Sequence, residues 1–507
     1  MASPSTTPTT EDPAAVDAGD GPRPLQPFAV GPVLGIAAVA AASMLAFATR
    51  YGYHRDELYF IAAGRHLDGG YVDQPPVTPL VARAADVLFG HSLLGLRSVT
   101  ALLVALGVVG VGLLARELGG GRVAQVLAAF TVAASPLLRA HNSFLGTTGL
   151  DQLMWAATFL AAARLLRTGN PRYWLAVGAA LGLGLETKAT IILLAVGLLV
   201  GVVADRRFAL LRSWWFAAGV AAAFAIWAPN LVWNATNDWA MVTFSEGKHS
   251  HIGDVVMYAY FVVGQVLTAG ITTAFVWVPG WRWLFTRQPT AAPFRALGIA
   301  AAVVTAVFFV MGAKYYYGAP VYLLLFAAGS VALEAGLRRT RIVATWMVAL
   351  SIVLCLPMTV PLLPAGEADA VAAVNRTYSS MVGWPELAGQ VQSIVDSLPA
   401  DEQARTVVFA GNYGEAGALE HFAPDLRVYS GHNSYWTWGP PPDSATTAVL
   451  LGFGDAAPTG LCRSPEQVGT VTNDAGLDNY ESGQPIWLCR DLVRPWSEAW
   501  RAQQAYT

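Results

Sequence analysis

The sequence contains eleven apolar segments, and each is long enough, or nearly long enough, to cross a lipid bilayer. A helix needs about 20 mainly apolar residues to cross roughly 30 Å of hydrocarbon. The composition agrees, because 54% of the residues are hydrophobic and only 13% are charged. We therefore expect a polytopic α-helical protein of the cell membrane with about 11 transmembrane helices. The segments are residues 28–50, 92–115, 123–138, 149–166, 173–187, 189–203, 213–232, 255–279, 294–312, 318–335 and 341–361.

The net charge of −3 is the sum of three parts that differ in charge. Residues 1–27 carry one cation and four acids (−3), residues 28–361 carry 23 cations and 13 acids (+10), and residues 362–507 carry 7 cations and 17 acids (−10). This division predicts a disordered tail, a transmembrane domain and a separate acidic domain. A strongly basic, nucleic-acid-binding protein is excluded, so we expect no nucleic acid partner.

Arginines mark one end of the predicted spans. They recur in alternate loops, and cations between spans concentrate on the cytoplasmic side of a membrane. With the tail 1–27 in the cytoplasm, eleven spans place residues 362–507 on the extracytoplasmic side and make residues 51–91 the first outer loop. The arginines are Arg116 and Arg122; Arg164, Arg167 and Arg172; Arg206, Arg207 and Arg212; Arg282, Arg287 and Arg295; and Arg338, Arg339 and Arg341.

All three lysines fall on the outer side, where this rule disfavours cations: Lys188, Lys248 and Lys314. In one interpretation they are accidental in an arginine-biased chain. In the other they are functional, since ionisable groups beside membrane spans are costly unless they are partnered or used. Positive charge at this depth would stabilise a departing lipid phosphate. The candidates for that role are Lys188 and Lys314, joined by Arg139, Arg65 or Arg83.

The first outer loop contains two amphipathic stretches, which we expect to lie in the plane of the membrane interface. One opens with His54-Arg55-Asp56-Glu57, and the other follows Asp73-Gln74-Pro75-Pro76. An Asp that nearby cations keep ionised suits a general base, which removes the proton from an attacking hydroxyl. The other interpretation of Asp56 is a helix cap whose side chain accepts backbone N–H groups.

The C-terminal residues 362–507 read as a small α/β domain. Apolar runs predict strands at 406–410, 426–429 and 448–453, with a helix at 414–422. Cys462 and Cys489 form one disulfide if this domain faces an oxidising compartment, whereas Cys355 is expected to be a buried core residue. Residues 411–414 follow a strand but lack the glycine spacing and the lysine of a phosphate loop, so nucleotide binding is not expected.

Five strings resemble a known enzyme family: Asp56-Glu57-Leu58-Tyr59-Phe60, Gly70-Tyr71-Val72-Asp73-Gln74-Pro75-Pro76, Leu118-Gly119-Gly120-Gly121-Arg122, Glu186-Thr187-Lys188 and Lys314-Tyr315-Tyr316. Together they are similar to the bacterial membrane glycosyltransferases of glycosyltransferase family 39. This family is related to the protein O-mannosyltransferases and the lipid A aminoarabinose transferase. The resemblance covers about residues 50–330, and the Tyr-Val-Asp-Gln-Pro-Pro string is its most specific part.

The resemblance implies a GT-C fold and an inverting transfer from a polyprenyl-phosphate-linked sugar on the outer face. The acceptor would be a hydroxyl of an envelope glycan, lipid or protein. Asp56 is the implied base, and Asp151 stands two positions after the place where the family often has an acid. The expected catalytic residues are Asp56 and Glu57. The donor phosphate is assigned to Lys188, Lys314 and Arg139, and the substrate to His54, Arg55, Tyr59, Asp73, Gln74, Asp151 and Tyr316.

Other interpretations of the sequence stay open. Tyr316 is one of three tyrosines after Lys314 that alternatively form an interfacial aromatic belt. A flippase or transporter for the lipid-linked sugar is the rival function, although such proteins usually place ionisable groups near the middle of the bilayer. A scaffold that holds envelope enzymes is a third. No cofactor is certain; outer carboxylates would suit a divalent cation, but no ligand spacing requires a metal.

Overall fold

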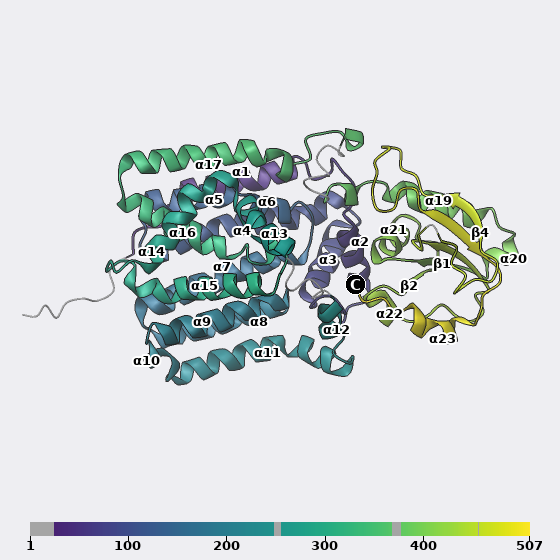
Figure 1. Cartoon of the computed structure of the whole chain (residues 1–507), viewed down its shortest axis with the longest axis horizontal. Coiled ribbons are helices and arrows are strands. Elements are labelled where there is room, and N and C mark those ends of the chain that lie inside the picture. The colour runs from purple at the N-terminus through teal and green to yellow at the C-terminus, as the bar shows by residue number, and fades with distance from the viewer. Residues whose placement is uncertain (1–24, 248–254, 368–376, 455) are drawn as a thin grey trace, which may run out of the picture.

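The computed structural model describes residues 25–247, 255–367, 377–454 and 456–507. It has a helical body and a C-terminal α/β unit, with two helices of the first outer loop between them (Figure 1). Most of the predicted tail 1–27, and Lys248, lie outside the described residues.

The helical body is built from helices that lie side by side with similar axis directions (Figure 1). Glycines allow neighbouring backbones to approach closely, as at Gly178 on Gly219 and at Gly329 on Val276. Large apolar side chains such as Phe224 and Trp346 remain exposed on the outside, as expected for surfaces that face lipid. The principal helices are α1 (Val30–Leu45), α4 (Leu93–Glu117), α5 (Arg122–Ala134), α7 (Thr147–Thr168), α8 (Trp174–Leu185), α9 (Ile192–Ala204), α11 (Trp214–Thr236), α14 (Ala274–Phe285), α15 (Arg295–Val310), α16 (Val321–Ala335) and α17 (Arg338–Thr359).

Within the described residues, four helices are long and apolar enough to cross a membrane, and a bent pair would make a fifth. Several shorter apolar helices accompany them, so the count of eleven spans stays a prediction. The single helix predicted at 255–279 is wrong. Its path bends by 85° between α13 (Val255–Ala269) and the helical segment Ile271–Phe285. Gly270 stands at the bend with a φ of +96°, a conformation that glycine adopts without steric cost.

A second predicted span, 123–138, also contains a break. α5 ends at Ala134, and the short helix α6 (Pro136–His141) begins directly after Ser135. Ser135 caps α6 by accepting the N–H of Leu137, and proline at the first helical position has no N–H that would need a partner. The remaining short helices of the body are α10 (Phe208–Leu211) and α12 (Ala240–Gly247).

The first outer loop forms α2 (Arg55–Arg65) and α3 (Val77–Phe89). The apolar face of α3 leaves Leu80 and Leu88 exposed, which suits an interfacial helix. The same expectation is wrong for α2, because every residue from Glu57 to Gly64 is buried. Its outer side is covered by α21 (Tyr413–Phe422) of the C-terminal unit, and Gly417 permits the close crossing.

The C-terminal unit has a five-stranded mixed sheet in the order β2-β1-β3-β5-β4. The three predicted strands and the predicted helix are confirmed within two residues. β1 runs parallel to β2 and β3, and β5 is antiparallel to β3 and β4. A disulfide joins Cys462 to Cys489, and Cys355 is buried and free. The strands are β1 (Thr406–Ala410), β2 (Val428–Ser430), β3 (Thr447–Leu451), β4 (Glu466–Thr470) and β5 (Pro485–Cys489), and the other helices are α19 (Trp384–Asp396), α20 (Ala400–Gln403), α22 (Ser434–Thr437) and α23 (Trp496–Ala499).

One apolar core joins the first outer loop to the C-terminal unit. Leu58 and Ile61 of α2 belong to the same buried cluster as Trp384, Val408 and Leu488. The α/β unit is therefore packed onto the loop that carries Asp56 rather than tethered beside it.

Candidate active site

A cavity of about 980 Å³ lies where the first outer loop, the ends of several body helices and the C-terminal unit meet. Eight of the predicted site residues line it, although they come from four separate stretches of the sequence. They are His54, Asp56, Tyr59, Asp73, Gln74, Lys188, Lys314 and Tyr316. The structure therefore gathers most of the predicted set into one space.

Asp56 lies at the first turn of α2, and its side chain is about one-third exposed. Its Oδ1 accepts a hydrogen bond from the hydroxyl of Tyr413 at 2.9 Å. The helix is capped by His54 instead, because His54 Nδ1 accepts the Asp56 backbone N–H at 3.1 Å. Burial lowers the pKa of His54, which keeps the imidazole neutral and able to accept. The carboxylate of Asp56 is thus not consumed by helix capping.

Glu57 faces the opposite way and does not line the cavity. Its carboxylate is fully buried and pairs with Arg97, whose Nη2 lies 2.8 Å from Oε2. Its two oxygens also accept the backbone N–H groups of His54 at 2.8 Å and Leu145 at 3.0 Å. With both oxygens occupied, Glu57 is placed as a structural residue and not, as expected from the sequence, as a partner of Asp56 in catalysis.

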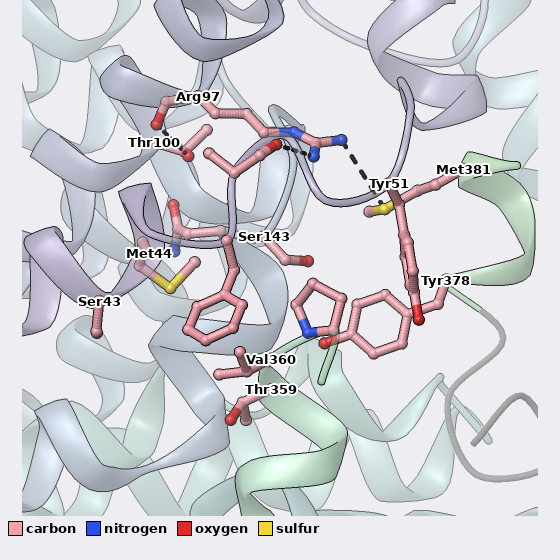
Figure 2. Close-up of a pocket in the computed structure, with 14 residues that line it drawn as sticks. Ser43, Met44, Tyr51, Arg97, Thr100, Ser143, Thr359, Val360, Tyr378 and Met381 are labelled. Atoms are coloured by element: carbon pink, nitrogen blue, oxygen red, sulfur yellow. Dashed lines mark hydrogen bonds between the residues drawn. The ribbon is translucent and has the colours of Figure 1, made fainter. Parts of the chain in front are cut away.

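Arg97, the partner of Glu57, also binds the backbone of the segment that leads into α2. It also donates to the backbone carbonyls of Ala48 and Gly52, at 2.5 and 2.8 Å. Figure 2 shows it extending past a small cavity of about 20 Å³ toward Met381 of the C-terminal unit. Such a volume holds about one water molecule, so this second cavity is no substrate site.

Asp73 and Gln74 follow α2 and form another wall of the large cavity. Asp73 accepts hydrogen bonds from the Tyr59 hydroxyl at 2.7 Å and from Asn433 at 3.3 Å. Gln74 is only 2% exposed, and neither atom of its side-chain amide has a hydrogen-bond partner among the described residues. A buried amide without partners is costly, so Gln74 is the residue of this wall most clearly suited to bind a polar ligand.

Lys188 and Lys314 supply the positive charge of the cavity. The Lys188 ammonium lies 4.5 Å from the ring centre of Tyr317 and 5.3 Å from that of Tyr316, within the range of cation–π attraction. It is also 3.4 Å from the Thr148 hydroxyl. Lys314 is exposed and lines the same space. The first residues of α7 border the cavity too, and backbone N–H groups at a helix N-terminus attract anions.

The other predicted site residues do not line this cavity. Arg139 donates to Ser43 at 2.9 Å, and Asp151 is buried and accepts from the indole of Trp155 at 2.9 Å. Arg55 points toward the C-terminal unit, with its guanidinium carbon 4.8 Å from the ring centre of Tyr413. The further cation candidates Arg65 and Arg83 also lie outside the lining, and Arg83 bonds to Asp86 instead.

The sequence-based prediction missed Tyr413, which the C-terminal unit contributes to the cavity. A local signal exists, because Asn412 and Glu415 form a capping box that fixes the start of α21. Its pairing with Asp56 spans 357 residues and could not be read from the sequence. Within the part of the chain that the structure describes, no group of three or more His, Cys, Asp or Glu side chains could hold a metal ion.

Known proteins resemble this chain in sequence profile and in fold. Residues 73–233 match the family described as dolichyl-phosphate-mannose-protein mannosyltransferase. The solved structure of ArnT from Cupriavidus metallidurans bound to undecaprenyl phosphate is similar, with 17% identity, a TM-score of 0.60, and 90% of this chain and 97% of that chain covered.

Two further solved structures show weaker similarity to this chain. The apo oligosaccharyltransferase of Archaeoglobus fulgidus has 15% identity, a TM-score of 0.47, and 78% and 64% of the two chains covered. The arabinofuranosyltransferase AftD from Mycobacteria has 15% identity, a TM-score of 0.49, and 89% and 40% covered. No curated protein sequence matches this one. The family profile and the ArnT fold confirm the resemblance that the five strings indicate.

Proposed function

We propose that this chain, which shares the GT-C fold of membrane glycosyltransferases, moves a sugar from a polyprenyl-phosphate donor to an acceptor hydroxyl. The observation that carries the proposal is a single cavity lined both by the half-buried carboxylate Asp56 and by the cations Lys188 and Lys314. A base and an anion site sharing one space are the two elements that this transfer requires.

The proposed reaction is a single displacement. Asp56 takes the proton of the acceptor hydroxyl while that oxygen forms a bond to the anomeric carbon. The bond between the anomeric carbon and the phosphate oxygen breaks, and its electron pair leaves with the phosphate. Lys188, Lys314 and the N-terminus of α7 stabilise the charge that grows on the phosphate. Attack opposite the leaving group inverts the anomeric configuration.

The donor class is supported by what the relatives are described as binding. The ArnT structure contains undecaprenyl phosphate, and the matched family is named for dolichyl phosphate mannose. Both lipids are polyprenyl phosphates. The two lysines and the apolar cavity wall of α13 and α15, which includes Val263 and Phe308, suit such an amphipathic donor.

The reaction is proposed to occur on the outer face of the membrane. The disulfide between Cys462 and Cys489 supports it, since disulfides persist in oxidising compartments and are rare in the cytosol. The arginine-rich loops at one end of the predicted spans point to the same orientation. Because the C-terminal unit packs on the cavity, the chemistry and this unit share one side of the membrane.

The test of the base is Asp56→Asn expressed in a strain that lacks the native protein. Mass spectrometry of the envelope should show that the product absent from the deletion strain is not restored, although the variant reaches wild-type levels in the membrane. Asp86→Asn is the matched control, because Asp86 lies in the same loop but pairs with Arg83 and His91 outside the cavity. Product formation by Asp56→Asn would refute the assigned base.

The test of the phosphate site is the affinity of purified protein for undecaprenyl phosphate. Lys188→Ala and Lys314→Ala should each weaken binding, whereas Arg139→Ala should not, because the Arg139 side chain lies outside the cavity. The removal of one hydrogen bond to a charged group typically costs about 1.5–3 kcal/mol, or roughly 10-fold to 150-fold in affinity. Unchanged affinity in both lysine variants would place the phosphate elsewhere.

A further inference from the structure

We propose that Tyr413 of the C-terminal unit is a positioning residue for Asp56, so that this unit is an integral part of the active site. The inference rests on the proposed function, since it concerns the group assigned there as the base. It gives a role in the reaction to residues that follow the membrane domain, whereas the matched family profile ends at residue 233.

The contact between the two residues is direct. The Tyr413 hydroxyl donates to Asp56 Oδ1 at 2.9 Å, and both side chains line the large cavity. Burial and the neighbouring Asp56 carboxylate raise the pKa of Tyr413 well above its ordinary value of 10. The phenol therefore keeps its proton at neutral pH and remains a donor.

This hydrogen bond gives the two oxygens of the Asp56 carboxylate different surroundings. Oδ1 is occupied by Tyr413, while Oδ2 lies 3.8 Å from His54 Nδ1, which is beyond hydrogen-bond distance. Among the described residues, none donates a hydrogen bond to Oδ2. Tyr413 thereby holds the carboxylate in one orientation and leaves Oδ2 free to accept the acceptor proton.

The tyrosine ring is itself held firmly. It stacks on Tyr59 at 4.7 Å between ring centres and on His432 at 5.0 Å. The backbone N–H of Tyr413 donates to His432 Nδ1 at 3.1 Å, and the Arg55 guanidinium lies against the ring. A side chain fixed by aromatic stacking, a cation and its own backbone has little freedom to lose when substrate binds, which suits a positioning role.

The decisive variant is Tyr413→Phe, because it removes the hydroxyl and keeps the stacked ring. We expect the initial rate of product formation in the deletion strain, at matched protein levels, to fall about 10-fold to 100-fold, because a small misplacement of a catalytic group can cost about 100-fold in rate. The affinity of the purified variant for undecaprenyl phosphate and its unfolding temperature should equal those of the wild type. A purely structural role would change the unfolding temperature as well.

Tyr378→Phe is the matched control. Tyr378 also belongs to the C-terminal segment and is buried, but it lines the small cavity of Figure 2 and not the large one, and its hydroxyl has no hydrogen-bond partner among the described residues. Removal of the Tyr378 hydroxyl should leave the rate of product formation unchanged.

The outcomes separate the two proposals. An inactive Asp56→Asn together with a fully active Tyr413→Phe would overturn the role of Tyr413 and leave the proposed function standing. An active Asp56→Asn would overturn both, because no base would then remain for Tyr413 to position. A slow Tyr413→Phe whose unfolding temperature or lipid affinity falls in parallel would also overturn the positioning role, in favour of a structural one.

Discussion

Glu57→Gln is predicted to destabilise the protein, whereas the same change at the adjacent acid, Asp56→Asn, is predicted to stop transfer without loss of stability. Glu57 accepts four hydrogen bonds while fully buried: two from Arg97, at 2.8 and 3.2 Å, and one each from the backbones of His54 and Leu145. An amide nitrogen in place of either oxygen turns an acceptor into a donor. Two of these four donors then lose their partner.

The expected cost follows from burial. Each buried donor left without a partner costs about 1–3 kcal/mol, and breaking a buried ion pair by changing one member costs about 3–5 kcal/mol in total. Arg97 is only 4% exposed, so water cannot replace the lost carboxylate. At about 2–4 °C per kcal/mol, the ratio typical of domains of roughly 150–250 residues, this corresponds to a fall in unfolding temperature of roughly 6–20 °C.

Thermal unfolding of the purified variants in detergent measures this difference directly. Asp56→Asn serves as the matched change of charge and should unfold within about 2 °C of the wild type, because the Asn amide oxygen can still accept the Tyr413 hydroxyl and the side chain is about one-third exposed. The double variant Glu57→Gln/Arg97→Gln should lose less stability than the two single variants added together, since neither charge is then left alone. A Glu57→Gln protein with wild-type stability would refute the structural role of the ion pair.

Three further predictions concern the C-terminal unit. Burial raises the pKa of Glu415 to about 8 from an ordinary 4.5. Between these two values the folded state holds a proton that the unfolded chain releases. The free energy of unfolding should therefore fall as the pH rises from about 5 to 8, by at most about 1.4 kcal/mol per pH unit. Glu415→Gln should flatten this dependence in unfolding measured across that range, and an unaltered slope would contradict it. Replacing Cys462 and Cys489 by Ala opens a loop with a sequence separation of 27 and should cost about 3.5 kcal/mol, seen as a lower unfolding temperature that reducing agent no longer changes. Gly417→Val places a side chain against the backbone of α2 and should reduce transfer. The control Gly389→Ala meets no neighbouring atom within 4 Å and should leave transfer and stability intact. Equal activity of both variants would show that the crossing of α2 and α21 tolerates displacement.

The membrane character could be predicted from the composition, and most of the eight predicted residues that line the large cavity stand in short strings that resemble a known family. The helix break at Gly270 could not, since the apolar run continues through it and only backbone conformation reveals the bend. Asp56 and Glu57 are neighbours in the sequence, but successive residues of a helix point about 100° apart, and the partner that occupies Glu57 lies forty residues away. The sequence therefore could not distinguish the acid in the cavity from the acid in the core.

The shared core of α2 and the C-terminal unit also constrains how the protein is made. Leu58 and Ile61 leave the ribosome more than 300 residues before Trp384 and Leu488, the residues that cover them. Contacts between such distant segments form late, so during synthesis the apolar side chains of α2 stay partly uncovered until the strands of the C-terminal unit have been made. The cavity around Asp56 should therefore form only after the C-terminal unit has been made, and residues 51–91 are the place where chaperones or proteases would meet an unfinished chain.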